Sequence, residues 1–94
     1  MLWGVTDLLR RLLDQKVLSP SNLVVDMDPR KKSHLVSYGI VPLEPKDCIQ
    51  QIKESALIAI FTHKQRYVDE ILQWIKQETG RILLQSEVEL VGII

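Results

Sequence analysis

ALIAIFT, at residues 56–62, contains the longest apolar run of this 94-residue chain, and the class of fold depends on the structure that this run adopts. A continuous apolar run fits either a buried strand or part of a buried helix. Helical spacing leads into the run without Gly or Pro, at Ile49, Ile52, Ala56, Ala59 and Ile60. This spacing favours a helix, and a strand over 56–62 stays open as the alternative.

The helical pattern continues beyond the run. One helical face is formed by Tyr67, Val68, Ile71, Leu72 and Ile75. Gly80 follows as a residue suited to the end of a helix. A single helix over 46–79 would be about three times the average length, so a break near His63 would give two shorter helices instead.

The first residues, 2–18, predict an amphipathic helix. Leu8, Leu9, Leu12 and Leu13 repeat on one broad face. Thr6 or Asp7 is suited to the start of this helix, and Pro20 cannot continue it.

Two β-rich segments, 23–28 and 34–41, flank a polar turn that contains Pro29, which predicts an antiparallel hairpin. Residues 81–94 alternate between apolar and polar side chains, as in a strand with one buried face. The expected fold is therefore α+β: an N-terminal helix, a β-hairpin, one long or two shorter helices and a C-terminal strand. These elements would form one domain, 1–94, with a small, mainly antiparallel sheet packed on the helices.

The composition is that of an ordinary globular protein, with 46% hydrophobic and 26% charged residues. Twelve basic residues balance twelve acidic ones, which weighs against a dedicated nucleic-acid-binding domain. A lone cysteine, Cys48, excludes an intrachain disulfide and fits a reducing compartment, so we expect a cytoplasmic protein. The longest apolar run is too short to span a bilayer.

The sequence lacks the motifs of the common enzyme classes. Its four glycines are isolated, so it has neither a P-loop nor a dinucleotide-binding fingerprint. His34, His63 and Cys48 lack the paired spacing of a zinc site. Cys48, paired with a histidine, would be a candidate nucleophile, although a structural thiol is commoner. We therefore expect no enzymatic activity, no cofactor and no metal.

Two acidic pairs suggest a weaker alternative. Asp26 and Asp28 share one side of a predicted strand, and so do Glu87 and Glu89. If these strands were neighbours, four carboxylates could hold Mg²⁺ or Mn²⁺ for phosphodiester hydrolysis. The ordinary interpretation is the solvated face of a sheet.

A basic cluster, Arg30, Lys31 and Lys32, lies at the predicted hairpin turn. Such a cluster could contact phosphates, and a phosphate-contacting module that binds nucleic acid is the main alternative function. A solvated turn is the more ordinary interpretation for a chain without net charge.

The function that the sequence favours is non-catalytic protein–protein interaction, as an assembly or regulatory domain that self-associates or binds another protein. The segment 46–79 carries more apolar surface than one face of a small sheet needs, and both ends of the chain are apolar. The expected interface residues lie on the helices and on the terminal strand: Leu57, Ile58, Phe61, Trp74, Val91, Ile93 and Ile94.

Overall fold

Four parallel strands form one sheet in the computed structural model, which describes residues 1–19 and 22–93. The strands are β1 (Leu2–Trp3), β2 (Val24–Val25), β3 (Ile58–Phe61) and β4 (Val88–Val91). Their order across the sheet is β2-β1-β3-β4, and every neighbouring pair is parallel. The expected antiparallel sheet is therefore wrong: the fold is α/β with parallel strands.

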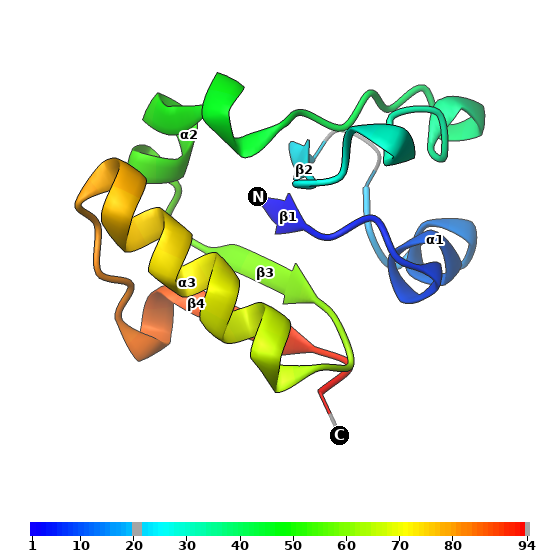
Figure 1. Cartoon of the computed structure of the whole chain (residues 1–94). Coiled ribbons are helices and arrows are strands. Elements are labelled where there is room, and N and C mark those ends of the chain that lie inside the picture. Colours follow the sequence, from blue (N-terminus) through cyan, green and yellow to red (C-terminus); the bar gives the residue numbers. More distant parts are fainter. Residues whose placement is uncertain (20–21, 94) are drawn as a thin grey trace.

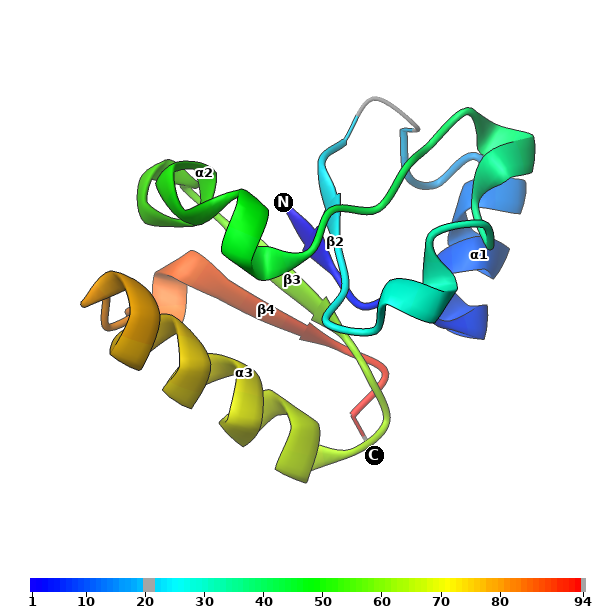
Figure 2. The ribbon, with the colours of Figure 1, turned by 45° about the horizontal axis from the view of Figure 1, so that its top comes forward.

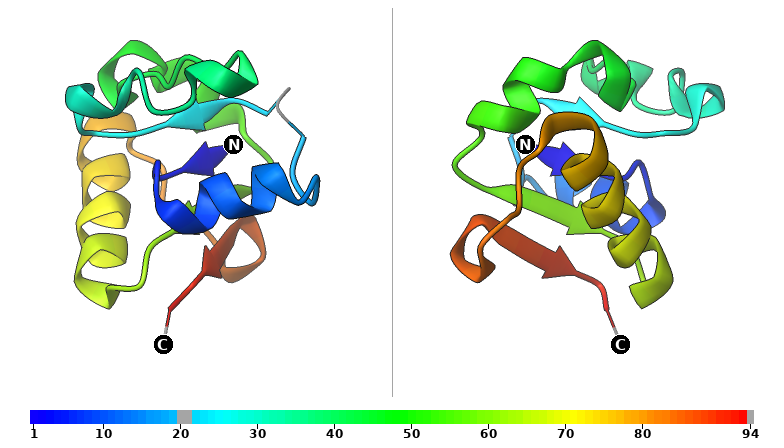
Figure 3. Two further views of the ribbon diagram at one scale, coloured as in Figure 1. Left: turned by 90° about the vertical axis from the view of Figure 1, so that its right-hand side faces the viewer. Right: turned by 60° about the vertical axis from the view of Figure 1, so that its left-hand side comes forward.

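Helices connect the strands and cover both faces of the sheet (Figure 1). The α-helices are α1 (Asp7–Asp14), α2 (Ile49–Glu54) and α3 (Gln65–Thr79). Short 3₁₀ turns are η1 (Pro29–Lys31), η2 (Val36–Tyr38), η3 (Pro45–Asp47) and η4 (Gln85–Glu87). In Figure 2 the strands run between α1 on one side and α2 and α3 on the other, and the two views in Figure 3 show α1 and α3 in front of opposite faces.

The two faces of the sheet bury separate halves of the core. The α1 half contains Leu2, Val5, Leu9, Leu13, Val24, Leu35, Ile40, Ala59 and Phe61. The α2 and α3 half contains Trp3, Val25, Cys48, Ile52, Ile58, Ile60, Val68, Ile71 and Ile75. Burial on both sides is what parallel strands with helical connections require.

Strand β3 explains why the helix over 46–79 was the wrong prediction. Ile58 and Ile60 face α2 and α3, whereas Ala59 and Phe61 face α1, so all four side chains are buried. A strand covered on both faces has no polar alternation and gives a continuous apolar run. The helical spacing that leads into it belongs to α2, which ends at Glu54, and helix resumes only at Gln65. The alternative of a strand over 56–62 is therefore confirmed at Ile58–Phe61, and two helices do not meet near His63.

The predicted hairpin is also wrong. Residues 34–41 contain the 3₁₀ turn η2 (Val36–Tyr38) and no strand, because Leu35 and Ile40, five positions apart, both turn into the α1 half of the core. The segment beside β2 is reached only at Leu43, which makes an isolated parallel bridge with Val25.

The terminal elements are shorter than predicted. Residues 2–3 form β1, so the first helix covers only Asp7–Asp14, and the last strand covers only Val88–Val91. Within these bounds the predicted details are confirmed: Leu9 and Leu13 are buried, Thr6 accepts from the Leu9 amide at the start of α1, and Gly80 ends α3 in the left-handed conformation. None of the helices in the described part of the chain is long and apolar enough to cross a bilayer.

Candidate functional site

The carboxyl ends of the four strands meet at one edge of the sheet, because all strands run in the same direction. At this edge the chain leaves β1 towards α1 on one face and leaves β3 towards α3 on the other. These connections diverge between two adjacent strands, which opens a crevice between the loops. In open α/β sheets, ligands bind at this topological switch point.

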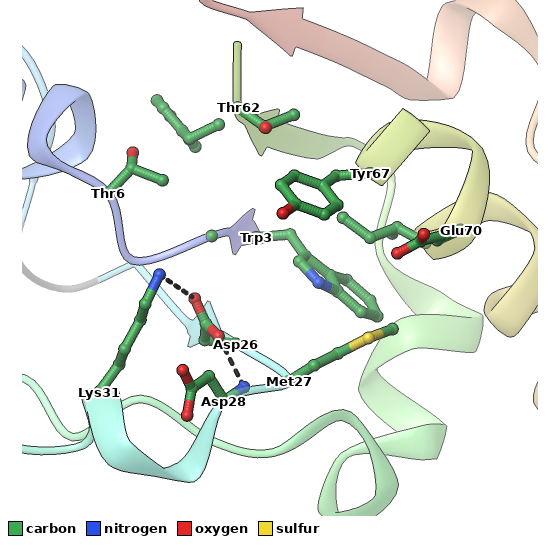
Figure 4. Close-up of a pocket in the computed structure, with 12 residues that line it drawn as sticks. Trp3, Thr6, Asp26, Met27, Asp28, Lys31, Thr62, Tyr67 and Glu70 are labelled. Atoms are coloured by element: carbon green, nitrogen blue, oxygen red, sulfur yellow. Dashed lines mark hydrogen bonds and ion pairs between the residues drawn. The ribbon is translucent and has the colours of Figure 1, made fainter. Parts of the chain in front are cut away.

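A cleft of about 340 Å³ lies at the switch point. The loops after β1, β2 and β3 and the first two turns of α3 line it (Figure 4). Its lining includes Trp3, Asp26, Met27, Thr62, Tyr67 and Glu70. The volume falls within the range of about 300–1,000 Å³ that is common for small-molecule sites.

Gly4 lines the cleft directly after β1, which pairs with β3. Its φ of +114° belongs to a region that residues with a Cβ rarely adopt. A Cβ at this position would lie 2.6 Å from the carbonyl oxygen of Phe61. The close approach of the two strand ends therefore requires glycine here.

Asp26, directly after β2, ties the loops of the cleft together. Its carboxylate accepts hydrogen bonds from the amides of Val5 and Asp28, both at 2.7 Å, and the side chain is only 11% exposed. Lys31 Nζ donates to the Val5 carbonyl at 3.0 Å and lies 3.9 Å from the Asp26 carboxylate. A carboxylate offers about four lone-pair sites, so Asp26 retains acceptor capacity beyond these two amide hydrogen bonds.

The opposite wall of the cleft is aromatic and apolar. The Tyr67 side chain projects from the first turn of α3 and is 40% exposed, and Met27 is exposed to a similar degree. Trp3 lies beneath them, buried, with its ring 5.9 Å from the ring of Trp74 in an edge-to-face arrangement. The wall therefore offers an accessible ring and thioether backed by a fixed indole.

The charges that line the cleft are mainly negative. Asp26, Asp28 and Glu70 supply carboxylates, and Lys31 supplies the one ammonium group in the described lining. Arg30 beside Asp28 lowers the pKa of that carboxyl group to about 2, so it stays ionised at neutral pH. This cleft is suited to groups that donate hydrogen bonds or carry positive charge, and it opposes anions.

The predicted basic cluster is divided among separate partners. Arg30 pairs with Asp28 at 2.9 Å, and Lys32 Nζ lies 3.7 Å from the Glu44 carboxylate. Lys31 is directed back to the Val5 carbonyl. Of the three cations, Lys31 alone is among the described residues that line the cleft, and each of the three already contacts a carboxylate or a carbonyl of the chain.

The four carboxylates of the metal-site alternative do not come together. Asp26 and Asp28 follow β2, whereas Glu89 lies on β4, and these are the two outer strands of the sheet. Glu87 precedes β4, at the opposite edge, where it pairs with Arg81 at 3.0 Å. Within residues 1–19 and 22–93, no three His, Cys, Asp or Glu side chains form a group that could hold a metal ion.

The cysteine and the histidines also lie apart from the cleft lining. Cys48 is 1% exposed in the α2 and α3 half of the core, and burial together with Asp47 raises the pKa of its thiol, which opposes a nucleophilic role. The His63 ring nitrogen Nδ1 lies 2.8 Å from the Gly92 carbonyl oxygen, where it links the ends of β3 and β4.

The expected interface residues are dispersed over the fold. Ile58 and Phe61 are fully enclosed in β3, which leaves them no surface for a partner, whereas Leu57 is 42% exposed. Trp74 packs partly buried against the core, as do Val91 and Ile93 on the last strand and just after it. Ile94 lies outside the described residues.

Sequence reasoning missed the cleft residues Trp3, Met27, Thr62, Tyr67 and Glu70. The available signal was positional: Asp26 and Thr62 each come directly after an apolar strand segment. That signal indicates one common site only when the strands are known to be parallel.

Comparison with family models, with curated proteins and with solved structures found no match to this chain.

Proposed function

We propose that this chain is a small-molecule-binding domain and that its ligand occupies the cleft at the carboxyl edge of the sheet. The observation that carries the proposal is the position of this cleft at the divergence of the β1 and β3 connections. A parallel sheet places loops from several strands around such a point, so side chains far apart in sequence can act on one ligand.

The lining selects the chemistry of the ligand. Tyr67 and Met27 offer accessible apolar surface to a planar group. The carboxylates of Asp26, Asp28 and Glu70 accept hydrogen bonds from hydroxyl or amino groups on its rim. We therefore expect a planar ligand that carries such donors and is neutral or positively charged.

Phosphorylated ligands fit this cleft poorly. Phosphate sites in such folds use free backbone amides after the first strand, but the Val5 amide is already bound by Asp26. Lys31 is directed to the Val5 carbonyl and lies 3.9 Å from the Asp26 carboxylate, and Asp28 and Glu70 add two further carboxylates to the lining. Anion binding would require these contacts to break, so we expect that the cleft does not bind the phosphate groups of nucleotides.

Two indole compounds of opposite charge test the proposal. Tryptamine carries an ammonium group, whereas indole-3-propionate carries a carboxylate on the same ring. Titration of ¹⁵N-labelled protein should shift the amides of Gly4 and Thr62 and the Trp3 indole N–H with tryptamine, with much smaller shifts for indole-3-propionate. Adenosine serves as a second planar probe with hydroxyl donors and no charge.

Paired variants on α3 locate the site. Glu70→Gln should weaken tryptamine binding, whereas Glu78→Gln, exposed near the other end of the same helix, should leave it unchanged. If neither tryptamine nor adenosine shifts the cleft amides, or if the carboxylate compound binds as well as the amine, the proposed ligand chemistry is wrong.

A further inference from the structure

The two outer edges of the sheet are treated differently. Beside β2, Leu43 covers the edge: its amide donates to the Val24 carbonyl at 2.9 Å, and its carbonyl accepts from the Asp26 amide at 3.0 Å. Along β4, none of residues 1–19 and 22–93 pairs with the outer edge. An uncovered edge presents unpaired amides and carbonyls to another strand.

The outward groups of β4 follow from its pairing with β3. Phe61 is in register with Val91, and the Thr62 amide donates to the Val91 carbonyl at 3.1 Å, so Val91 is bonded towards β3. Successive residues of a strand direct their N–H and C=O groups to opposite sides. Val88 and Leu90 therefore direct theirs outward, at the open edge.

We propose that β4 pairs in antiparallel fashion with β4 of a second copy of this chain, about a two-fold axis that passes beside Leu90. A two-fold axis perpendicular to the sheet gives the same surface to both copies and closes the assembly as a dimer. It also keeps each face of the sheet continuous, so two directly opposed residues must point to the same face. The axis can then pass beside Val88, Glu89, Leu90 or Val91, which gives four possible registers.

Charge and backbone geometry select one of the four. The register centred on Glu89 sets two carboxylates directly opposite each other, which is destabilising. Centring on Val88 sets Glu87 against Glu89 of the second copy and requires η4 (Gln85–Glu87) to become a strand. Centring on Val91 sets Leu90 against Gly92, so both hydrogen-bonded pairs beside the axis would involve Gly92, whose carbonyl is already bound by His63. Centring on Leu90 places Gly92 only opposite Val88, at the two ends of the paired segment, and leaves the central hydrogen-bonded pair free of it.

The remaining register is centred on Leu90. Its outward amide and carbonyl bond to the carbonyl and amide of Leu90 in the second copy, which gives a hydrogen-bonded pair. The two Leu90 side chains, each 42% exposed in one copy, then cover each other, and Glu89 stands opposite Val91 instead of another acid. The chain has no net charge to oppose this association.

This surface is separate from the cleft, so each proposal stands without the other. The cleft lies where the loops of β1, β2 and β3 meet, and its lining contains no residue of β4. A monomeric chain would therefore not contradict ligand binding in the cleft, and a cleft without a ligand would not contradict the dimer.

Mass against concentration tests the dimer. Sedimentation velocity from micromolar to millimolar concentration should show a rise in mass for the unaltered chain. Leu90→Lys places two like charges opposite each other and should abolish that rise. Leu57→Lys is the matched control, because Leu57 is also 42% exposed but lies before β3, and it should leave the rise unchanged. A monomer at every concentration, or equal losses in both variants, would overturn the proposal.

Cysteine cross-linking tests the register. A hydrogen-bonded antiparallel pair has its Cα atoms about 5.5 Å apart, which a disulfide can span. Leu90→Cys should therefore form a covalent dimer under mild oxidation, whereas Glu89→Cys, which is two residues out of register with its copy, should not. Native Cys48 is buried, and the unaltered chain controls for it. Cross-linking of Glu89→Cys in preference to Leu90→Cys would contradict the Leu90-centred register.

Discussion

The Val5 amide donates to the Asp26 carboxylate at 2.7 Å, and this bond joins the loop after β1 to the loop after β2. The same carboxylate accepts from the Asp28 amide, so one nearly buried side chain fixes two loops of the cleft. An acid at this position therefore serves the architecture of the site as well as its electrostatics.

Asp26→Ala should destabilise the fold because it leaves the Val5 and Asp28 amides without their acceptor. We expect a loss of about 1–3 kcal/mol in the free energy of unfolding, measured by urea denaturation. Asp47→Ala, which removes an exposed carboxylate from η3, should change stability by less than about 0.5 kcal/mol. Equal effects of the two substitutions would contradict the role given to Asp26.

Gly4→Ala should be more damaging than Gly80→Ala, although both glycines have positive φ. At Gly80 an added Cβ meets open space, so only backbone strain of about 1 kcal/mol is expected. At Gly4 the Cβ also collides with the Phe61 carbonyl, and strain plus collision should cost about 3 kcal/mol or more. Thermal unfolding of the two variants side by side measures the difference, and similar melting temperatures would exclude the close approach.

The amphipathic helices α1 and α3 could largely be predicted, because the sequence signals for them are local. The leucines of α1 repeat at helical spacing, and Thr6 and Gly80 mark helix ends by their own chemistry. Strand β1 could not be predicted, since Leu2–Trp3 is too short to show any periodicity. Its place in the sheet depends on partners more than twenty residues away, β2 and β3.

The cleft could not be predicted because it depends on strand direction. The Ile58–Phe61 segment has the same apolar composition as a buried helix turn, and only its burial on both faces identifies it as a central parallel strand. Once β3 is interpreted as a helix, Asp26 and Thr62 lose their common edge. One wrongly assigned element was therefore enough to prevent prediction of the site.

Trp74→Ala should weaken the fold without altering assembly. Trp74 packs partly buried on the α2 and α3 half of the core and meets Trp3 edge-to-face. Loss of this contact should cost about 2 kcal/mol in unfolding free energy, and Trp74→Phe should restore part of it. Chemical denaturation followed by Trp3 fluorescence gives the stability, and sedimentation gives the mass. A variant that loses self-association at full stability would instead place Trp74 in an interface.

Glu87 connects η4 to the core through Arg81. Its carboxylate accepts from the Leu84 amide at 2.8 Å and pairs with Arg81, while the Arg81 guanidinium also donates to the Ile52 carbonyl at 2.6 Å. The Leu84 amide and the Arg81 charge lower the pKa of Glu87 below its usual value of 4.5. The folded state therefore binds this proton less readily than the unfolded chain does.

The pH dependence of stability follows from that direction. The stabilisation from Glu87 should be fully present above pH 4.5, the usual value, and should be lost as the pH falls through the lower pKa of the folded state. Glu87→Gln removes this titration, so the variant should be less stable than the unaltered chain at pH 7 and approach it in acid. Urea denaturation at a series of pH values measures both, with Glu78→Gln, an exposed glutamate on α3, as the control. A constant gap between Glu87→Gln and the unaltered chain from pH 7 to pH 3 would show that the carboxylate charge does not stabilise the fold.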